Sequence, residues 1–126
     1  MAISILNVAA GQLGVVNSPP SVMFAGSTTK ATIVKGIVLT NRGVGTETVN
    51  IYLKPGVNGL LSSGTPLYLL SPKDLKLPPS GQVVLDVEIT LGVGLNTSTT
   101  YADQILGTTT TAGTVDYILN GMQRDL

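Results

Sequence analysis

Glycine and proline interrupt this sequence about every ten residues, and the segments between them are rich in threonine, valine and isoleucine. In residues 82–91 (QVVLDVEITL), apolar side chains alternate with mostly polar ones. That alternation is typical of a β-strand with one buried and one solvated face, whereas no long stretch keeps helical periodicity. The pattern predicts an all-β chain: an antiparallel β-sandwich, Ig-like or jelly-roll-like, of seven to eight strands.

The turn signals divide the chain into two parts. Residues 1–29 contain short apolar pieces separated by Gly, Asn-Ser-Pro-Pro and Gly-Ser-Thr-Thr, which predicts an extended N-terminal arm with a lead-in strand. Residues 30–126 form the predicted sandwich domain. Its strands are expected at 30–41, 47–54, 67–70, 74–77 and 82–91, followed by a final pair at 101–106 and 114–122.

The segment ATIVKGIVLTN (31–41) is apolar at almost every position. As a regular strand it places Ile33, Ile37 and Leu39 on one face, and Val34 and Val38 on the other. The second face also carries Gly36, where a neighbouring chain could approach closely. We interpret the two dry faces as one for folding and one for assembly, and the sequence leaves open which of them faces the core.

The charge content supports assembly. Charged residues make up 11% of the chain, against roughly a quarter in ordinary soluble domains. No apolar run approaches the ~20 residues of a membrane-spanning helix, and the N-terminus lacks the basic region of a secretory signal. We therefore expect other protein chains, and not a membrane, to cover much of the surface.

The inventory of reactive groups is small. The chain has no Cys and no His, which excludes disulfides, thiolate nucleophiles and the usual zinc sites. Its seven basic and seven acidic residues are scattered, so no nucleic-acid surface is indicated. Asp86 and Glu88 share a strand face, where we favour a solvated surface over a glycosidase pair. Asp103 and Asp116 are interpreted in the same way over a calcium site. We predict no enzyme, and no catalytic, cofactor or metal site.

A glycan-binding module is the alternative. The polar loops 57–65 and 107–113 and the four tyrosines could form a sugar-stacking surface, although the chain has no Trp and one Phe. We interpret the tyrosines as core or interface aromatics.

The run KATIVKGIVLTNRGVGTETVNIYLK (30–54) resembles a pattern in small virion structural proteins of tailed bacteriophages. Their strand reads "AIVKSIVLTN", followed by a Gly/Ser/Thr turn and a "VTVxLYL" strand. Weaker similarity continues through LKLPPSGQVVLD (75–86), YADQI (101–105) and VDYILNG (115–121). The chain departs from the pattern at residues 23–26, where MFAG replaces Tyr-x-x-Pro-Ala-Gly.

The resemblance implies a symmetric oligomer on a virion, either as a capsid decoration (cement) protein or as part of a tail, fibre or spike. We expect a homo-oligomer, specifically a homotrimer, bound to the major capsid protein or other virion proteins at the capsid surface. The arm and the second face of residues 31–41 provide the predicted interface. Its residues are Ile3, Ile5, Leu6, Val8, Leu13, Val15, Val16, Val34, Gly36 and Val38.

Overall fold

The computed structural model describes residues 3–15, 20–27, 30–55, 67–91, 103–111 and 113–125. These residues contain no helix and form ten strands, two of which are only two residues long. The strands are β1 (Ile3–Gln12), β2 (Gly14–Val15), β3 (Ser21–Ala25), β4 (Lys30–Asn41), β5 (Glu47–Lys54), β6 (Tyr68–Leu69), β7 (Leu75–Leu77), β8 (Gln82–Leu91), β9 (Gln104–Thr109) and β10 (Val115–Asp125).

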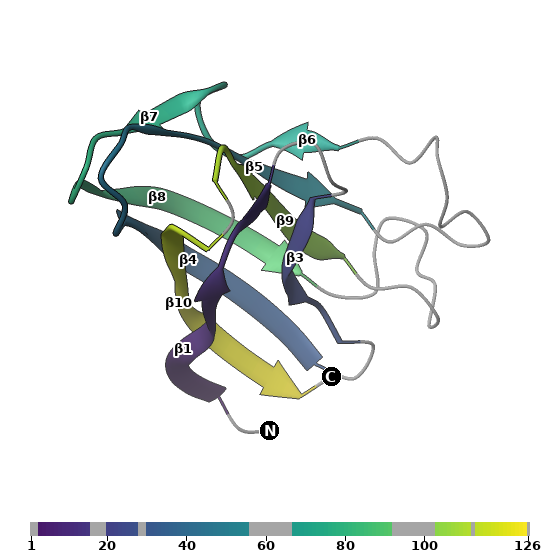
Figure 1. The fold of residues 1–126 in the computed structure, drawn as a ribbon. Helices are drawn as coiled ribbons and strands as arrows, with labels where there is room; N and C mark the ends of the chain where they lie inside the picture. The colour runs from purple at the N-terminus through teal and green to yellow at the C-terminus, as the bar shows by residue number, and fades with distance from the viewer. Residues whose placement is uncertain are drawn as a thin grey trace.

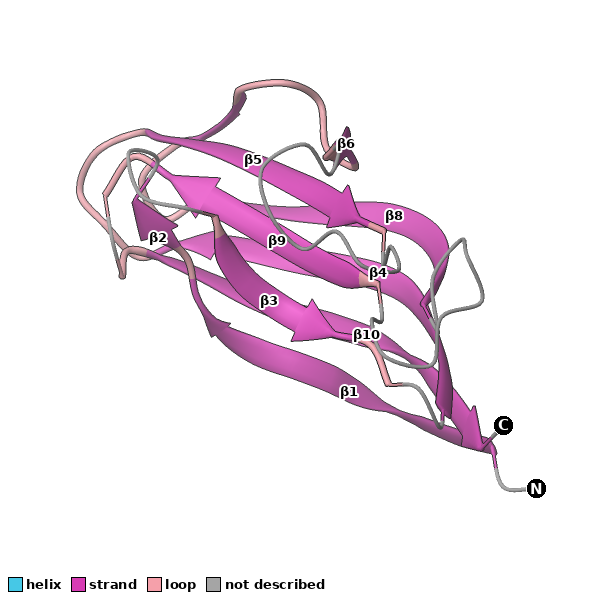
Figure 2. Cartoon of the chain, turned by 90° about the vertical axis from the view of Figure 1, so that its right-hand side faces the viewer, coloured by secondary structure: helices cyan, strands magenta, loops and turns pink. Residues whose placement is uncertain are grey.

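The strands form two sheets that pack face to face (Figures 1 and 2). Sheet A has the order β1-β10-β4-β8, and all of its pairs are antiparallel. Sheet B is built on the antiparallel pair β9-β5. Strand β3 pairs with β9, β6 and β7 pair with β5, and the short β2 runs parallel to β9. The predicted β-sandwich is confirmed.

The strands predicted at 30–41, 47–54 and 82–91 have those bounds in the structure. The predicted final pair is wrong, because β9 belongs to sheet B and β10 to sheet A. The connection after β9 crosses between the layers instead of closing a hairpin. It is fixed to the N-terminal segment by the amide of Gly113, which donates to the carbonyl of Leu13 at 3.0 Å.

The first 29 residues contribute strands to both sheets. Strand β1 pairs with β10 from Ile3 opposite Arg124 to Gln12 opposite Asp116. Strand β3 pairs with β9. The division of the chain after residue 29 remains a prediction, while in the structure the described N-terminal strands are hydrogen-bonded to strands of the other part.

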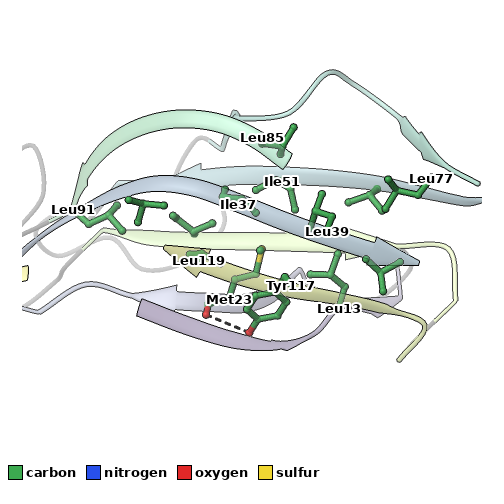
Figure 3. Close-up of a cluster of buried hydrophobic side chains, with 14 residues drawn as sticks. Leu13, Met23, Ile37, Leu39, Ile51, Leu77, Leu85, Leu91, Tyr117 and Leu119 are labelled. Carbon is green, nitrogen blue, oxygen red and sulfur yellow. Dashed lines mark hydrogen bonds between the residues drawn. The ribbon is translucent and has the colours of Figure 1, made fainter. Parts of the chain in front are cut away.

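The core lies between the sheets and is filled mainly by branched aliphatic side chains (Figure 3). Leu39 and Leu119 enter from sheet A, and Ile51 enters from sheet B, each fully buried. The hydroxyl of Tyr117 donates a hydrogen bond to the carbonyl of Met23 at 3.3 Å, which links the sheets near their β1 and β3 edges (Figure 3). Burial raises the pKa of the Tyr117 phenol.

Three β-bulges cross sheet A at one level. Opposite Asn120 of β10, the neighbouring strands each carry one extra residue, Val8 in β1 and Lys35 in β4, and β8 gains another relative to β4 next to Asp86. A bulge shifts the side-chain alternation by one position. Val34 is therefore fully buried in the core.

The strict alternation predicted for residues 31–41 is consequently wrong on the N-terminal side of the bulge. Val34 shares the core with Ile37 and Leu39, while Ile33 is half-buried opposite the exposed Thr90. On the other side of the bulge, Val38 faces away from Ile37 and Leu39, as predicted.

Buried polar side chains fix the loops at one end of the sandwich. The Nδ2 atom of Asn41 lies within hydrogen-bonding distance of the carbonyls of Gly45, Leu77 and Pro78, at 2.8, 3.0 and 3.2 Å. Its Oδ1 atom accepts from the amide of Gly43 at 2.8 Å. One fully buried amide thus ties the turn after β4 to the end of β7.

Candidate interaction surface

The outer face of sheet A carries a continuous apolar row. Its members are Ala10, Ile118, Val38 and Val84, one from each strand, and the strand register places them side by side. Val84 is 61% exposed and Ile118 is 38% exposed. Because neighbouring strands lie about 4.8 Å apart, the row crosses the whole sheet over roughly 14 Å. We call these four residues the apolar row.

Polar rows border the apolar row on both sides. One contains Gln12, Asp116, Thr40 and Gln82, in which the Gln82 amide donates to the Thr40 hydroxyl at 3.0 Å. The other contains Asn120, Gly36 and Asp86. An apolar centre with a polar border is the usual arrangement of a protein interface.

Two ion pairs neutralise charge beside the apolar row. Arg42 Nε lies 2.8 Å from Asp116 Oδ2, and Lys35 Nζ lies 2.7 Å from Glu88 Oε1. The hydrogen bond from Lys35, together with its charge, lowers the pKa of Glu88. These contacts are solvent-exposed, so we expect them to add little to stability, but they neutralise four of the charges on this face.

A hollow of about 280 Å³ opens beyond the second polar row, where β4 and β10 approach their paired ends. Its apolar lining comes from Ala31, Ile33 and Met122, and its polar lining from Thr90, Gln123 and Arg124. The volume suits one or two side chains of a partner and is below that of a typical small-molecule site.

The predicted interface residues fall into several environments. Val38 and Gly36 lie on the outer face of sheet A, and an added Cβ on Gly36 would have Leu85 O as its nearest neighbour, at 3.9 Å. Val34 and Leu13 are core residues, and Val8 packs partly buried against the core. Ile3, Ile5 and Leu6 lie in β1 and Val15 lies in β2, whereas Val16 lies outside the described residues.

Sequence reasoning missed three members of the apolar row, Ala10, Ile118 and Val84. Val84 breaks the polar side of the alternation in residues 82–91, which is a signal visible in the sequence. Ala10 and Ile118 carry no such signal, because their alignment with Val38 depends on the pairing of β1 and β4 with β10.

The acidic residues considered for catalysis are on the surface. Asp86 and Glu88 are both exposed on β8, and Glu88 is paired with Lys35. A lowered pKa keeps Glu88 ionised, whereas a glycosidase acid needs a raised pKa. Asp116 lies in sheet A and Asp103 precedes β9 of sheet B, so the two residues do not lie on paired strands, as a shared calcium site would require. Among the described residues, no group of three or more acidic side chains could hold a metal ion.

The loops of the glycan-binding alternative are only partly described. Residues 57–65 lie outside the described residues, and Gly107 to Thr109 are buried within β9. Of the tyrosines, Tyr68 is 51% exposed, Tyr117 is in the core, and Tyr101 is outside the described residues. The described residues include no helix that is long and apolar enough to cross a membrane.

No family model matches the chain, and no curated protein matches it. Solved structures do share its fold. A chain in the structure of infectious bursal disease virus strain Gx superposes with a TM-score of 0.52 at 10% identity, covering 97% of this chain. A chain of the infectious bursal virus derived T=1 particles gives 0.51 at 11% identity, with the same coverage. A chain of the T13 particle of this virus gives 0.51 at 8% identity.

These likenesses establish a shared β-sandwich fold. The chain covers only 32% and 30% of the first two chains it matches, so it corresponds to one part of each of them. The matched particles are those of infectious bursal disease virus, whereas the sequence pattern resembled virion proteins of tailed bacteriophages.

Proposed function

We propose that this protein is a structural subunit of a virus particle, without catalytic activity, that acts by burying its surface against other protein chains. The observation that carries the proposal is the apolar row across all four strands of sheet A. A surface of this kind is typical of a binding interface. The fold shared with chains of virus particles supports the same reading.

The specific role we propose is that of a capsid decoration (cement) protein of a tailed bacteriophage. It forms a homo-oligomer that binds the major capsid protein and raises particle stability by mass action. The resemblance of residues 30–54 to phage virion proteins supports this assignment. The homotrimer expected from that resemblance remains a prediction, which native mass spectrometry tests directly.

Location on the particle is the first test. Particles bearing a labelled copy of the protein, imaged by electron microscopy, are expected to show label distributed over the head. Label confined to the tail or its fibres would contradict the cement role and favour the glycan-binding alternative. Absence of the protein from purified particles would overturn the virion assignment itself.

Particle stability is the second test. Particles that lack the protein are expected to release their genome at a lower temperature than complete particles, and to release more of it when the salt concentration is lowered. Adding purified protein back to the depleted particles is the matched control and should restore the complete-particle temperature. Equal release temperatures for depleted and complete particles would contradict the cement role.

A further inference from the structure

We propose that the outer face of sheet A packs against the same face of a second copy of this chain, with Val84 of one copy over Ala10 of the other. The inference rests on the proposed function only for the claim that this contact forms on a virus particle. It deepens that function by naming the surface and its occupant, and its two-fold contact makes a dimer in place of the homotrimer expected from the resemblance. The apolar row and its two polar borders form the contact.

The size of the face agrees with a dimer. Strands β1 and β8 each contain ten residues and β10 contains eleven. At about 3.3 Å per residue and about 4.8 Å between strands, four such strands present roughly 600 Å² of flat area. Two faces together give about 1,200 Å², the lower end of the range for specific interfaces.

Most charges beside the apolar row are paired within the chain, with Asp86 as the exception, and this favours a partner of low charge such as a second copy. Beside the row, Lys35 is paired with Glu88 and Arg42 with Asp116, so neither pair needs a charge from the partner. The chain as a whole has a formal net charge of zero, so two copies do not repel each other at long range.

The unequal sizes along the apolar row select the orientation. Ala10, the smallest member, lies at the β1 end, and Val84, which is 61% exposed, lies at the β8 end. A two-fold axis parallel to the strands places Val84 over Ala10 and Ile118 over Val38. A larger side chain then faces a smaller one, and the spacing between the two faces is similar along the row. An axis along the row would oppose Val84 to itself and leave a gap between two alanines.

This orientation also separates like charges. Rows face their own kind, so Asp116 lies over Thr40, whose hydroxyl can donate, and Asp86 at the β8 end lies over the β1 end of the partner. No carboxylate faces its own copy.

Replacing Val84 with Lys tests the surface. Sedimentation equilibrium of the full chain at micromolar concentration is expected to show a dimer for the wild type and a dissociation constant raised at least tenfold for Val84→Lys, because the ammonium group must lose water at the contact. Val44→Lys is the matched control. Val44 is fully exposed in the turn after β4, so this variant should associate like the wild type.

Thermal unfolding of both variants is followed by circular dichroism. Val84→Lys is expected to remain folded, because residue 84 lies on the outer face and the substitution does not alter the core. A Val84→Lys protein that dimerises like the wild type overturns the proposal. A wild-type monomer at these concentrations also overturns it, and a trimer unaffected by Val84→Lys places the contact elsewhere.

Cross-linking tests the orientation. The chain has no cysteine, so Ala10→Cys and Val84→Cys introduce single reactive sites. Facing sheets lie about 10 Å apart, beyond the reach of a disulfide, so a short bifunctional maleimide is used. Mass spectrometry of the mixed variants is expected to find mainly Ala10→Cys joined to Val84→Cys. Predominant joining of Val84→Cys to itself overturns the stated orientation.

The two proposals fail separately. A dimer lost in Val84→Lys, with label absent from the head, removes the cement role and leaves the contact. Label on the head, with association unchanged in Val84→Lys, leaves the cement role and removes the contact.

Discussion

Gly121 occupies the tightest position in sheet A. It pairs with Val34 beside the bulge of β4, and an added Cβ would overlap the carbonyl oxygen of Ile33. That oxygen belongs to the backbone of a central strand and cannot swing aside as a side chain could. The requirement for glycine here therefore comes from space, because the bulge brings β4 and β10 close together.

The first prediction concerns this position. Gly121→Ala is expected to lower the free energy of unfolding by about 1–3 kcal/mol, the typical range for overpacking. Urea denaturation followed by circular dichroism measures the change. Gly45→Ala is the control, since an added Cβ there meets no atom within 4 Å, and it should stay within about 0.5 kcal/mol of the wild type. Equal effects of the two substitutions would contradict the argument.

Glu47 is a buried carboxylate in β5 that accepts hydrogen bonds from threonine residues at and after the end of β9. Burial alone raises its pKa, but this is outweighed by hydrogen bonds from the Thr111 amide at 2.7 Å and the Thr109 hydroxyl at 2.9 Å, with further contributions from other threonine hydroxyls. The net effect is a pKa below the usual value of 4.5. The ionised side chain thereby fastens the start of the connection between β9 and β10.

The second prediction follows from that lowered pKa. Because the folded pKa lies below the unfolded one, the contribution of Glu47 is fully present above the unfolded pKa and is lost as the pH falls through the folded pKa. Glu47→Gln should therefore lose less stability than the wild type between pH 7 and about pH 3, measured by urea midpoints. Glu88→Gln, at an exposed ion pair, is the control and should keep most of the acid sensitivity of the wild type. Identical acid losses in Glu47→Gln and wild type would contradict the prediction.

At the scale of elements, β1 is an edge strand of sheet A, and the residue that follows it belongs to the core. Its pairing with β10 extends along the strand, and the Tyr117 ring on β10 leaves no room for a Cβ at Gly11. Leu13, directly after β1, is 1% exposed and hydrogen-bonded to Val115 and Gly113. These contacts make the N-terminal segment part of the folded unit.

The third prediction tests whether the N-terminal segment is an arm. Deleting residues 2–12 is expected to abolish cooperative thermal unfolding, because β10 loses its edge partner and Tyr117 loses its cover. Differential scanning calorimetry measures the transition, and Ala10→Cys, which keeps the strand, serves as a folded control. A retained cooperative transition with weakened assembly would instead agree with the arm predicted from the sequence.

How far the sequence predicted these elements depends on how local their signals are. The bounds of the strand at 82–91 were predicted correctly because the alternation that indicates them lies wholly within those ten residues. The faces of residues 31–41 were assigned incorrectly at Val34 because the bulge at Lys35 is visible only in the register with β10. The sheet change between β9 and β10 depends on contacts of Gly113 with Leu13, which are distant in sequence.

The candidate surface was predicted less well for the same reason. Val38 and Gly36 were correctly expected on a face away from Ile37, but an apolar row across strands is a property of register between four distant segments. Single strands indicate which side chains share a face. They do not indicate which neighbours those side chains have.

At the scale of the whole molecule, the low charge content determines how copies should associate. The seven basic and seven acidic residues balance, and the ion pairs beside the apolar row are made within the chain. Association through this surface would be driven by burial of apolar area, which depends weakly on ionic strength.

The fourth prediction is that self-association is nearly independent of moderate salt. The dissociation constant of the wild-type oligomer should change less than about threefold when sodium chloride is raised from roughly 0.05 to 0.5 M, since screening acts mainly on unpaired charges. Sedimentation equilibrium at both salt concentrations provides the measurement. A tenfold or greater weakening would indicate an interface held by charges, and so contradict an apolar contact.

The three bulges at one level of sheet A also limit how the chain can misfold. With few charges to discourage wrong pairings, regular strands of Val, Ile and Thr could slide past one another by two residues and still match apolar to apolar. The extra residues beside Asn120, and the glycine that must follow it, fit together in a single alignment. The bulges and Gly121 thus select one register between the strands of sheet A.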